Sequence, residues 1–318
     1  MSGADRAHAS LAAVEALGAN APELASYQDE PPQMASGTVG KSGYLRLGFE
    51  RRGTKTILVD LERRTPFLVQ RALYWDRALP DMPCVFIITT SGCVLQGDRL
   101  ALDIALGQGA RAHVTTQSAM KIHSMDANCA AQTQSIRLGD DSYLEYLPDA
   151  VIPHRGARFA SDTTIEIAPN ATLLYAETML CGRKHHRPSE HFGFDVLSSR
   201  IAAARPGGAP LWTEKYVIEP ARSALTAAGV MGDFDVFGNV LLLTPKVHAD
   251  TIHAALQPVH DRPAGIAIGA SRLPNDAGLL VRVLGRESQS VKDAIRTFWS
   301  LARRTLLGVD IPPEFLWR

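Results

Sequence analysis

Three stretches of similar design decide the fold of this chain: LGQGARAH at residues 106–113, LGDDSYLE at 138–145 and IAPNATLL at 167–174. Each places a tight turn before a small residue (Ala110, Ser142 and Ala171) and then begins an alternating strand. The small residues recur at a spacing of 32 and then 29 residues. Such a period indicates one supersecondary unit stacked on the next, each covering its neighbour's apolar face. A β-helix-like coil is favoured, although turn-and-strand units also recur in β-sandwiches.

Short β-type runs continue on both sides of these stretches and end at Gly, Pro, Asn or Asp. They cover residues 44–49, 56–61, 84–89, 100–106, 112–116, 143–147, 163–167, 172–176 and 211–218. Helical periodicity is confined to residues 290–307, with Ser290 and Gly308 as possible caps, and more weakly to residues 247–256. The predicted fold class is therefore mainly β, with β-helix-like stacked sheets and two or so peripheral helices.

Composition divides the chain into a short N-terminal extension and one large unit. Residues 1–40 are rich in Ala, Ser, Gly and Pro, which predicts a flexible N-terminal extension with a short helical possibility at residues 11–17. Residues 41–318 are expected to form a single β domain.

The charge balance and the cysteines limit the possible partners and compartments. Lys plus Arg equals Asp plus Glu, 33 of each, so we expect no nucleic-acid partner and no attraction to an anionic membrane. Four scattered cysteines without a CxxC pair favour reduced thiols. The N-terminus lacks the apolar core of a signal peptide, and no apolar stretch is long enough to span a bilayer. A cytoplasmic protein is expected.

The sequence contains no complete catalytic motif. It has no GxSxG elbow, no GxxxxGK[ST] phosphate loop and no GxGxxG after a strand, so neither nucleotide hydrolysis nor NAD binding is predicted. We expect a protein that is not an enzyme.

The densest polar cluster, RKHHRPSEH at residues 183–191, contains His185, His186, Glu190 and His191. Imidazole and carboxylate groups suit a borderline metal. However, the spacing misses HxxEH by one residue, and Pro188 breaks the helix that this motif requires. Three interpretations stay open: a catalytic zinc site, a loop that handles nickel transiently, and a solvated charged loop without metal.

Polar residues also end the strands that follow the three repeat turns. They are Thr115, Thr116, Gln117, Glu145, Asp149 and Glu177. Stacking could align some of them inside the coil, where buried carboxylates and amides require hydrogen bonds or water. A hydrated channel with many weak oxygen donors suits a divalent ion in transit. The alternative is that these side chains simply face solvent.

Several stretches, taken in order, resemble the UreD (also called UreH) family of urease accessory proteins. SGCVLQGDRL at 91–100 resembles the family's GGxxGGD loop, and TTQSAMKI at 115–122 resembles its TTQxxxK(I/V) stretch. LEYLP at 144–148, followed by IPH at 152–154, resembles LEWLPQ(D/E)xI, and LCGR at 180–183 resembles LGR. Cys93 and Gln96 replace family glycines in the first loop.

The resemblance implies a β-helix with few helices that binds UreF, recruits the GTPase UreG and contacts apo-urease in a dimeric hetero-complex. It also implies no permanently bound cofactor, and Ni²⁺ in transit through an internal tunnel. The conduit candidates are Asp98, Thr115, Gln117, Glu145, Asp149, Glu177 and Glu190, with His185, His186 and His191 as further metal candidates. The rival interpretations are a β-helix enzyme that acts on carbohydrates and a stand-alone nickel-binding protein.

Overall fold

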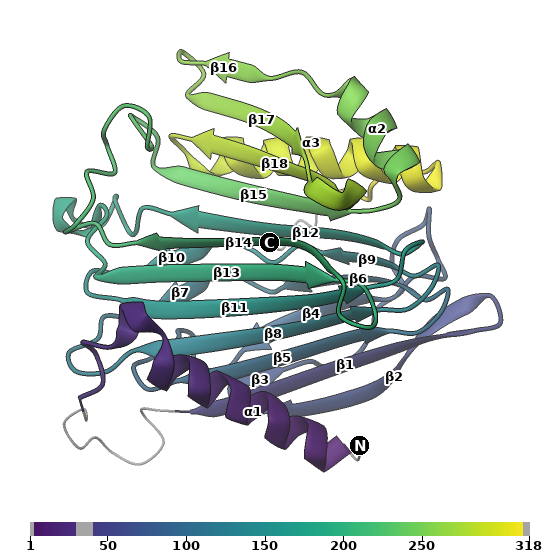
Figure 1. Ribbon diagram of the computed structural model, residues 1–318, viewed down its shortest axis with the longest axis horizontal. Helices are drawn as coiled ribbons and strands as arrows, with labels where there is room; N and C mark the ends of the chain where they lie inside the picture. The colour runs from purple at the N-terminus through teal and green to yellow at the C-terminus, as the bar shows by residue number, and fades with distance from the viewer. Residues whose placement is uncertain (1–2, 30–40, 314–318) are drawn as a thin grey trace.

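A computed structural model describes residues 3–29 and 41–313, which form two large β-sheets and three α-helices (Figure 1). The seven-stranded sheet has the order β14 (Pro210–Ile218), β13 (Val196–Ala204), β11 (Arg158–Ile167), β8 (Ala130–Leu138), β5 (Arg99–Leu106), β1 (Ser42–Arg52) and β2 (Lys55–Arg64).

The second sheet has eleven strands in the described part of the chain. Its main path runs β16 (Val259–Asp261), β17 (Ile266–Arg272), β18 (Gly278–Gly285), β15 (Val236–Leu243), β12 (Thr172–Leu180), β9 (Tyr143–Tyr146), β6 (Arg111–Thr116), β4 (Cys84–Thr89) and β3 (Phe67–Leu68). The short strands β7 (Met120–Ile122) and β10 (Val151–Pro153) pair beside this path.

The chain passes back and forth between the sheets from β5 to β13, and successive rungs pair in parallel. Ala112 pairs with Leu144, and Leu144 pairs with Leu173, which gives rung offsets of 32 and 29 residues. These offsets are the spacings of the repeat, so the β-helix-like stacking predicted from the sequence is confirmed. Antiparallel strands β15 to β18 extend the second sheet beyond the coil.

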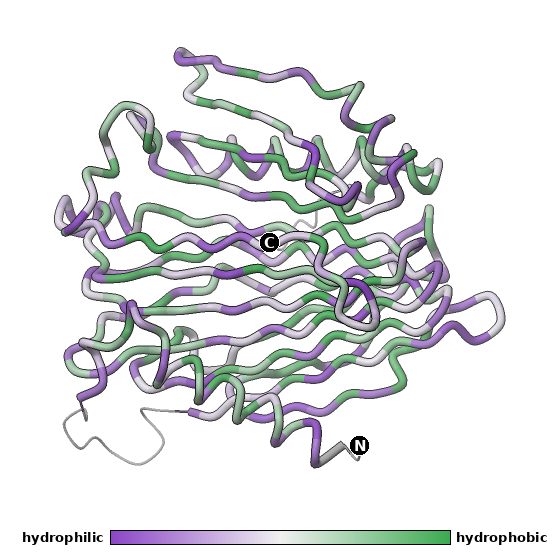
Figure 2. The backbone as a smooth tube through the Cα atoms, in the orientation of Figure 1, coloured by the Kyte–Doolittle hydropathy of each residue, from purple (hydrophilic) through white to green (hydrophobic). Residues whose placement is uncertain are grey.

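The largest core lies between the two sheets, where alternate side chains of each strand meet. It includes Leu47, Ile104, Ile136, Leu144 and Leu173, all almost fully buried. Figure 2 shows hydrophobic and hydrophilic residues alternating along many of these strands. This alternation is expected where one face of each strand is buried and the other is not.

Helix α1 (Gly3–Asn20) crosses the outer face of the seven-stranded sheet (Figure 1). Ala7 and Val14 are fully buried against Ala101 and Ala131 of that sheet. A flexible extension was expected here, so this expectation is corrected for residues 3–29. The reason is that small residues on both sides allow close approach, a property that composition alone does not reveal. Residues 1–2 and 30–40 of the expected extension lie outside the described residues.

Two further helices, α2 (Lys246–Ala255) and α3 (Ser288–Leu307), cover the outer face of the second sheet, and both were predicted. In α3 the apolar stripe includes Val291, Phe298 and Ala302, packed against β12, β15 and β18. Gly308 ends it at φ 69°, as predicted, whereas the N-cap is Glu287 rather than Ser290. Short 3-10 turns occur at Pro22–Leu24, Pro188–Glu190 and Pro274–Asp276. None of the helices within residues 3–29 and 41–313 has the length and apolar character needed to cross a membrane.

Candidate functional site

A cavity of about 120 Å³ lies between the two sheets, and part of its lining is polar. The polar side chains come from neighbouring rungs and include Gln132, Gln134, Tyr146, Tyr175, Glu177 and Ser199. Tyr146 donates a hydrogen bond to the Gln134 Oε1 at 2.6 Å, and the Gln134 amide donates to the Tyr175 hydroxyl at 3.2 Å. Because these bonds join both sheets, a connected polar network crosses the apolar core.

Glu177 on β12 is the carboxylate of this network. Its Oε1 accepts hydrogen bonds from the Tyr175 hydroxyl at 2.9 Å and the Ser199 hydroxyl at 3.1 Å. Burial raises the pKa of Glu177, although these two bonds oppose the effect. Since neither donor carries a charge, a cation entering the cavity would stabilise the ionised carboxylate.

Two further hollows extend outward from the interior cavity, the first adjoining it and the second adjoining the first. One, of about 260 Å³, lies between the outer face of the second sheet and α3 and shares Pro148, Asp149 and Thr178 with the interior cavity. The third hollow, of about 200 Å³, shares Leu180 and Ser288 with this outer hollow beneath α3. Asp149 is exposed at the first junction, so this predicted carboxylate stands where the interior cavity meets the outer hollow.

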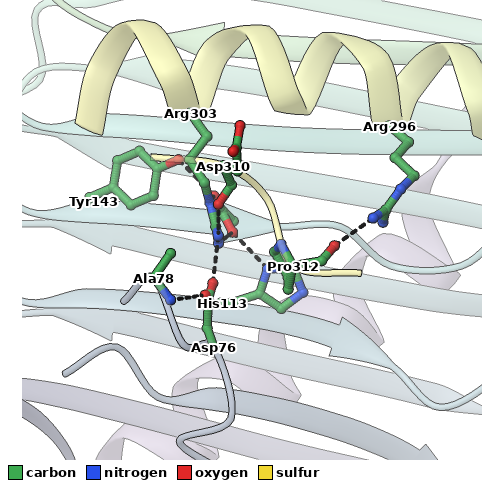
Figure 3. Close-up of polar contacts among 9 residues, drawn as sticks. Asp76, Ala78, His113, Tyr143, Arg296, Arg303, Asp310 and Pro312 are labelled. Atoms are coloured by element: carbon green, nitrogen blue, oxygen red, sulfur yellow. Dashed lines mark hydrogen bonds and ion pairs between the residues drawn. The ribbon is translucent and has the colours of Figure 1, made fainter. Parts of the chain in front are cut away.

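A buried charge network lies beneath α3, on the other face of the second sheet (Figure 3). Arg303 of α3 binds Glu145 through two hydrogen bonds of 2.8 Å and also pairs with Asp76. His113 Nδ1 lies 2.8 Å from the Glu145 Oε2, and the Tyr143 hydroxyl donates to Oε1 at 2.7 Å. In Figure 3 the guanidinium of Arg303 points from the helix into this group.

Glu145 therefore has an environment unlike that of Glu177. Burial alone would raise its pKa, but the hydrogen bonds from His113 and Arg303 outweigh burial and lower the pKa to about 2. Its two oxygens already accept four hydrogen bonds, and it faces α3 rather than the interior cavity. The structure thus does not bring Glu145 and Glu177 together, contrary to the alignment expected from the sequence.

The remaining conduit candidates are also dispersed. Asp98 is fully buried and accepts bonds from the backbone amides of Lys41 and Leu95, which organises a loop. Glu190 binds Arg183 at 2.6 Å and accepts from the Arg155 amide, and the Arg183 bond lowers its pKa most.

The two uncharged candidates also lie outside the interior cavity. The Thr115 hydroxyl donates to the Leu147 carbonyl at 2.6 Å and lines the outer hollow. Gln117 is exposed. Of the seven candidates, only Glu177 and Asp149 line the interior cavity.

The histidine-rich loop separates into two parts. His185 and His186 are exposed, whereas His191 Nε2 lies 2.7 Å from Asp235 Oδ1. The ligand atoms of Cys181, His191 and Asp235 all lie within 4.8 Å of one another. Burial raises the pKa of the Cys181 thiol to about 12.

Sequence reasoning missed most residues of these groups, among them Gln134, Tyr175, Asp235 and Arg303. Gln132 and Gln134 are the one local signal, because they occupy alternate positions of a single strand and therefore share a face. Asp235 lies 44 residues from His191, and no sequence pattern links them.

Residues 41–318 match the family described as UreD urease accessory protein. The chain is 60% identical over 302 residues to a protein of Photorhabdus laumondii named "Urease accessory protein UreD", covering 95% of this chain and 94% of that protein. It is 57% identical over 303 residues to a Yersinia pseudotuberculosis protein of the same name, with the same two shares. A Brucella suis protein named "Urease accessory protein UreD 2" is 53% identical over 295 residues, covering 93% of this chain and 98% of that protein.

Proposed function

The chain belongs to the UreD family of urease accessory proteins, and we propose that it conducts Ni²⁺ to apo-urease through the cavity between its sheets. The observation that carries this proposal is Glu177, a carboxylate in a polar cavity whose hydrogen-bond donors are both neutral. Such a carboxylate attracts a divalent ion, because burial disfavours its ionised form and the ion offsets that penalty.

The donors around Glu177 suit transit rather than storage. Tyr146, Tyr175 and Gln134 offer neutral oxygens, and only one carboxylate lies among them. Neutral oxygens hold Ni²⁺ more weakly than thiolate or imidazole ligands do. An ion can therefore enter the cavity and leave it again, as conduction requires.

Asp149 gives the conduit an entrance or exit. Its carboxylate is exposed at the junction between the interior cavity and the hollow beneath α3. An exposed carboxylate there raises the local concentration of cations at the opening. Glu145, Asp98 and Glu190 then serve to hold the fold through their hydrogen bonds.

We also propose a role in assembly rather than catalysis. The protein would bind UreF, and through it UreG, and would contact apo-urease within a dimeric hetero-complex. The relatives named above support the non-catalytic role, since each is named as an accessory protein. All four cysteines are free thiols, which suits a cytoplasmic location.

The test is to substitute Glu177→Gln, with Glu166→Gln as the matched control. Glu166 is an exposed carboxylate on β11, outside the interior cavity. Urease would be co-expressed with each variant and the other accessory proteins, purified, and analysed for nickel per active site. We expect Glu177→Gln to leave assembled urease that is poor in nickel, and Glu166→Gln to leave its nickel content unchanged. Full nickel loading with Glu177→Gln would overturn the conduit.

A further inference from the structure

Three side chains with different ligand atoms converge near the end of β12. Cys181 directly follows β12, His191 directly follows the 3-10 turn Pro188–Glu190, and Asp235 directly precedes β15. Their thiol sulfur, imidazole nitrogen and carboxylate oxygen all lie within 4.8 Å of one another. Thiolate, imidazole and carboxylate together form a ligand set for borderline divalent metals.

The backbone holds the three segments in place. The Cys181 amide donates to the Asp235 carbonyl at 2.8 Å, and the Phe192 amide donates to the Cys181 carbonyl at 2.6 Å. Gly182, at φ 116°, allows the next turn to approach closely, since a Cβ there would lie 2.2 Å from the Glu190 carbonyl oxygen. The ligand atoms are therefore positioned by the fold itself.

Access from solvent is available on one side. The side chains of His191 and Asp235 are 36% and 21% exposed, so an ion can reach them without opening the core. Cys181, although buried, lines the third hollow together with His185 and Glu287. That hollow adjoins the cavity beneath α3 and so lies at the outer end of the proposed conduit.

A lysine side chain balances the negative charge of the carboxylates at this site. The Lys184 Nζ lies 2.9 Å from Asp235 Oδ2 and 2.8 Å from Glu287 Oε1. A metal ion bound to Asp235 would compete with this ammonium group. The repulsion weakens binding, so the ion is held reversibly, as a transfer site requires.

We propose that Cys181, His191 and Asp235 form a transient binding site for a borderline divalent metal ion, Ni²⁺ in this setting. The proposal rests on the proposed function and adds a docking point at the outer end of the conduit. On binding, the Cys181 thiol releases its proton to water and its sulfur bonds the ion. The His191 Nε2–H, which donates to Asp235 Oδ1 in the structure, gives its proton to water while Nδ1 takes one from water. The neutral imidazole then bonds the ion through Nε2, and Asp235 Oδ1 and water complete the coordination.

The test is a titration of the full-length protein with NiCl₂, followed by the near-ultraviolet absorption of a thiolate-to-nickel bond. We expect a saturable band that Zn²⁺ removes by competition and Mg²⁺, which prefers oxygen ligands, does not. Cys181→Ser should abolish the band. His191→Gln should weaken nickel affinity at least as much as the roughly 10- to 100-fold caused by loss of an outer-shell partner.

Cys129→Ser is the matched control, because the Cys129 thiol contacts the Gly18 carbonyl of α1 and lies outside the interior cavity and both hollows. The band should persist in this variant. A band that survives Cys181→Ser, or one that Cys129→Ser removes, overturns the site. His191 is partly exposed, so His191→Gln tests the site even where Cys181→Ser disturbs folding.

The two proposals fail separately. If Glu177→Gln leaves the nickel content of urease unchanged, the conduit is refuted while the absorption band is unaffected. If the band is independent of Cys181 and His191, the docking site is refuted while the Glu177 result stands.

Discussion

Replacing Arg303 with methionine is expected to destabilise the protein strongly, because this residue joins the last helix to the β coil. Its guanidinium binds Glu145 with two hydrogen bonds and pairs with Asp76. The side chains of Arg303 and Glu145 are 1% and 0% exposed. Water therefore cannot replace the lost partner, and methionine leaves two buried carboxylates without their cation.

The known cost of breaking a buried ion pair sets the magnitude of this loss. Removing one member of a buried ion pair typically costs about 3–5 kcal/mol. The lowered pKa of Glu145 comes from the hydrogen bonds of both His113 and Arg303, and the variant removes only the Arg303 part. Since Glu145 keeps its bonds from His113 and Tyr143, we expect the lower end, about 3 kcal/mol.

The measurement is the free energy of unfolding in urea, followed by circular dichroism at neutral pH. Arg304→Met is the matched control, since Arg304 and its partner Asp310 are 65% and 72% exposed. An exposed pair contributes little, so the control should remain within about 1 kcal/mol of the natural protein. The reasoning is refuted if Arg303→Met loses less than about 1 kcal/mol, or if both variants lose equally.

Three further outcomes are expected. The pKa of Glu145 is lower in the folded state than in the unfolded state. Its contribution to stability should therefore be complete above about pH 4.5 and disappear as the pH falls towards about 2. The midpoint of urea unfolding, measured from pH 7 downward, would follow this loss. Gly182→Ala should lower the free energy of unfolding by roughly 1–3 kcal/mol, because Gly182 has a positive φ and its new Cβ would meet the Glu190 carbonyl. Gly92→Ala is the control and should cost less, since Gly92 also has a positive φ but lies in open space. Thermal unfolding would measure both. Leu24→Ala should lose about 2–5 kcal/mol, because Leu24 is fully buried against the first sheet, and limited proteolysis should then cleave residues 3–29 sooner.

The features of the fold that repeat locally could be predicted from the sequence. The turn residues at 107–110 and 139–142 mark the rung boundaries, and their spacing equals the pairing offset in the sheet. Helix α3 was predicted because its apolar residues recur with helical period over five turns. In both cases the signal lies within one stretch of chain.

Strand β8, AAQTQSIRL, shows why part of the fold was missed. Its Gln132 and Gln134 face the inside of the coil, where a hydrophobic residue is the rule. Hydrophobic periodicity predicts an exposed strand or a loop for such a stretch, because polar residues occupy the positions that face the core. The polar cavity and the missed strand thus have the same cause.

The candidate site was harder to predict because its contacts are distant in the sequence. Arg303 lies 158 residues from Glu145, and Asp235 lies 44 residues from His191. Sequence motifs link residues that lie close together in the chain, so they predict neither of these contacts. The sequence singled out the histidine loop as rich in donor atoms, but Asp235, which lies 2.7 Å from His191, directly precedes the distant strand β15.

The contrast between Glu145 and Glu177 turns on strand parity. Glu145 pairs with Leu174 across the sheet, and both point towards α3, whereas Glu177 stands three residues further along and points into the coil. On the outer face, Arg303 neutralises the carboxylate and lowers its pKa; on the inner face, burial without a cationic partner raises it. A carboxylate that is buried without a cation weakens the fold, so packing alone gives no reason for Glu177. In the proposed conduit a passing Ni²⁺ would supply the missing cation, so the proposal depends on Glu177 and not on the better-connected Glu145.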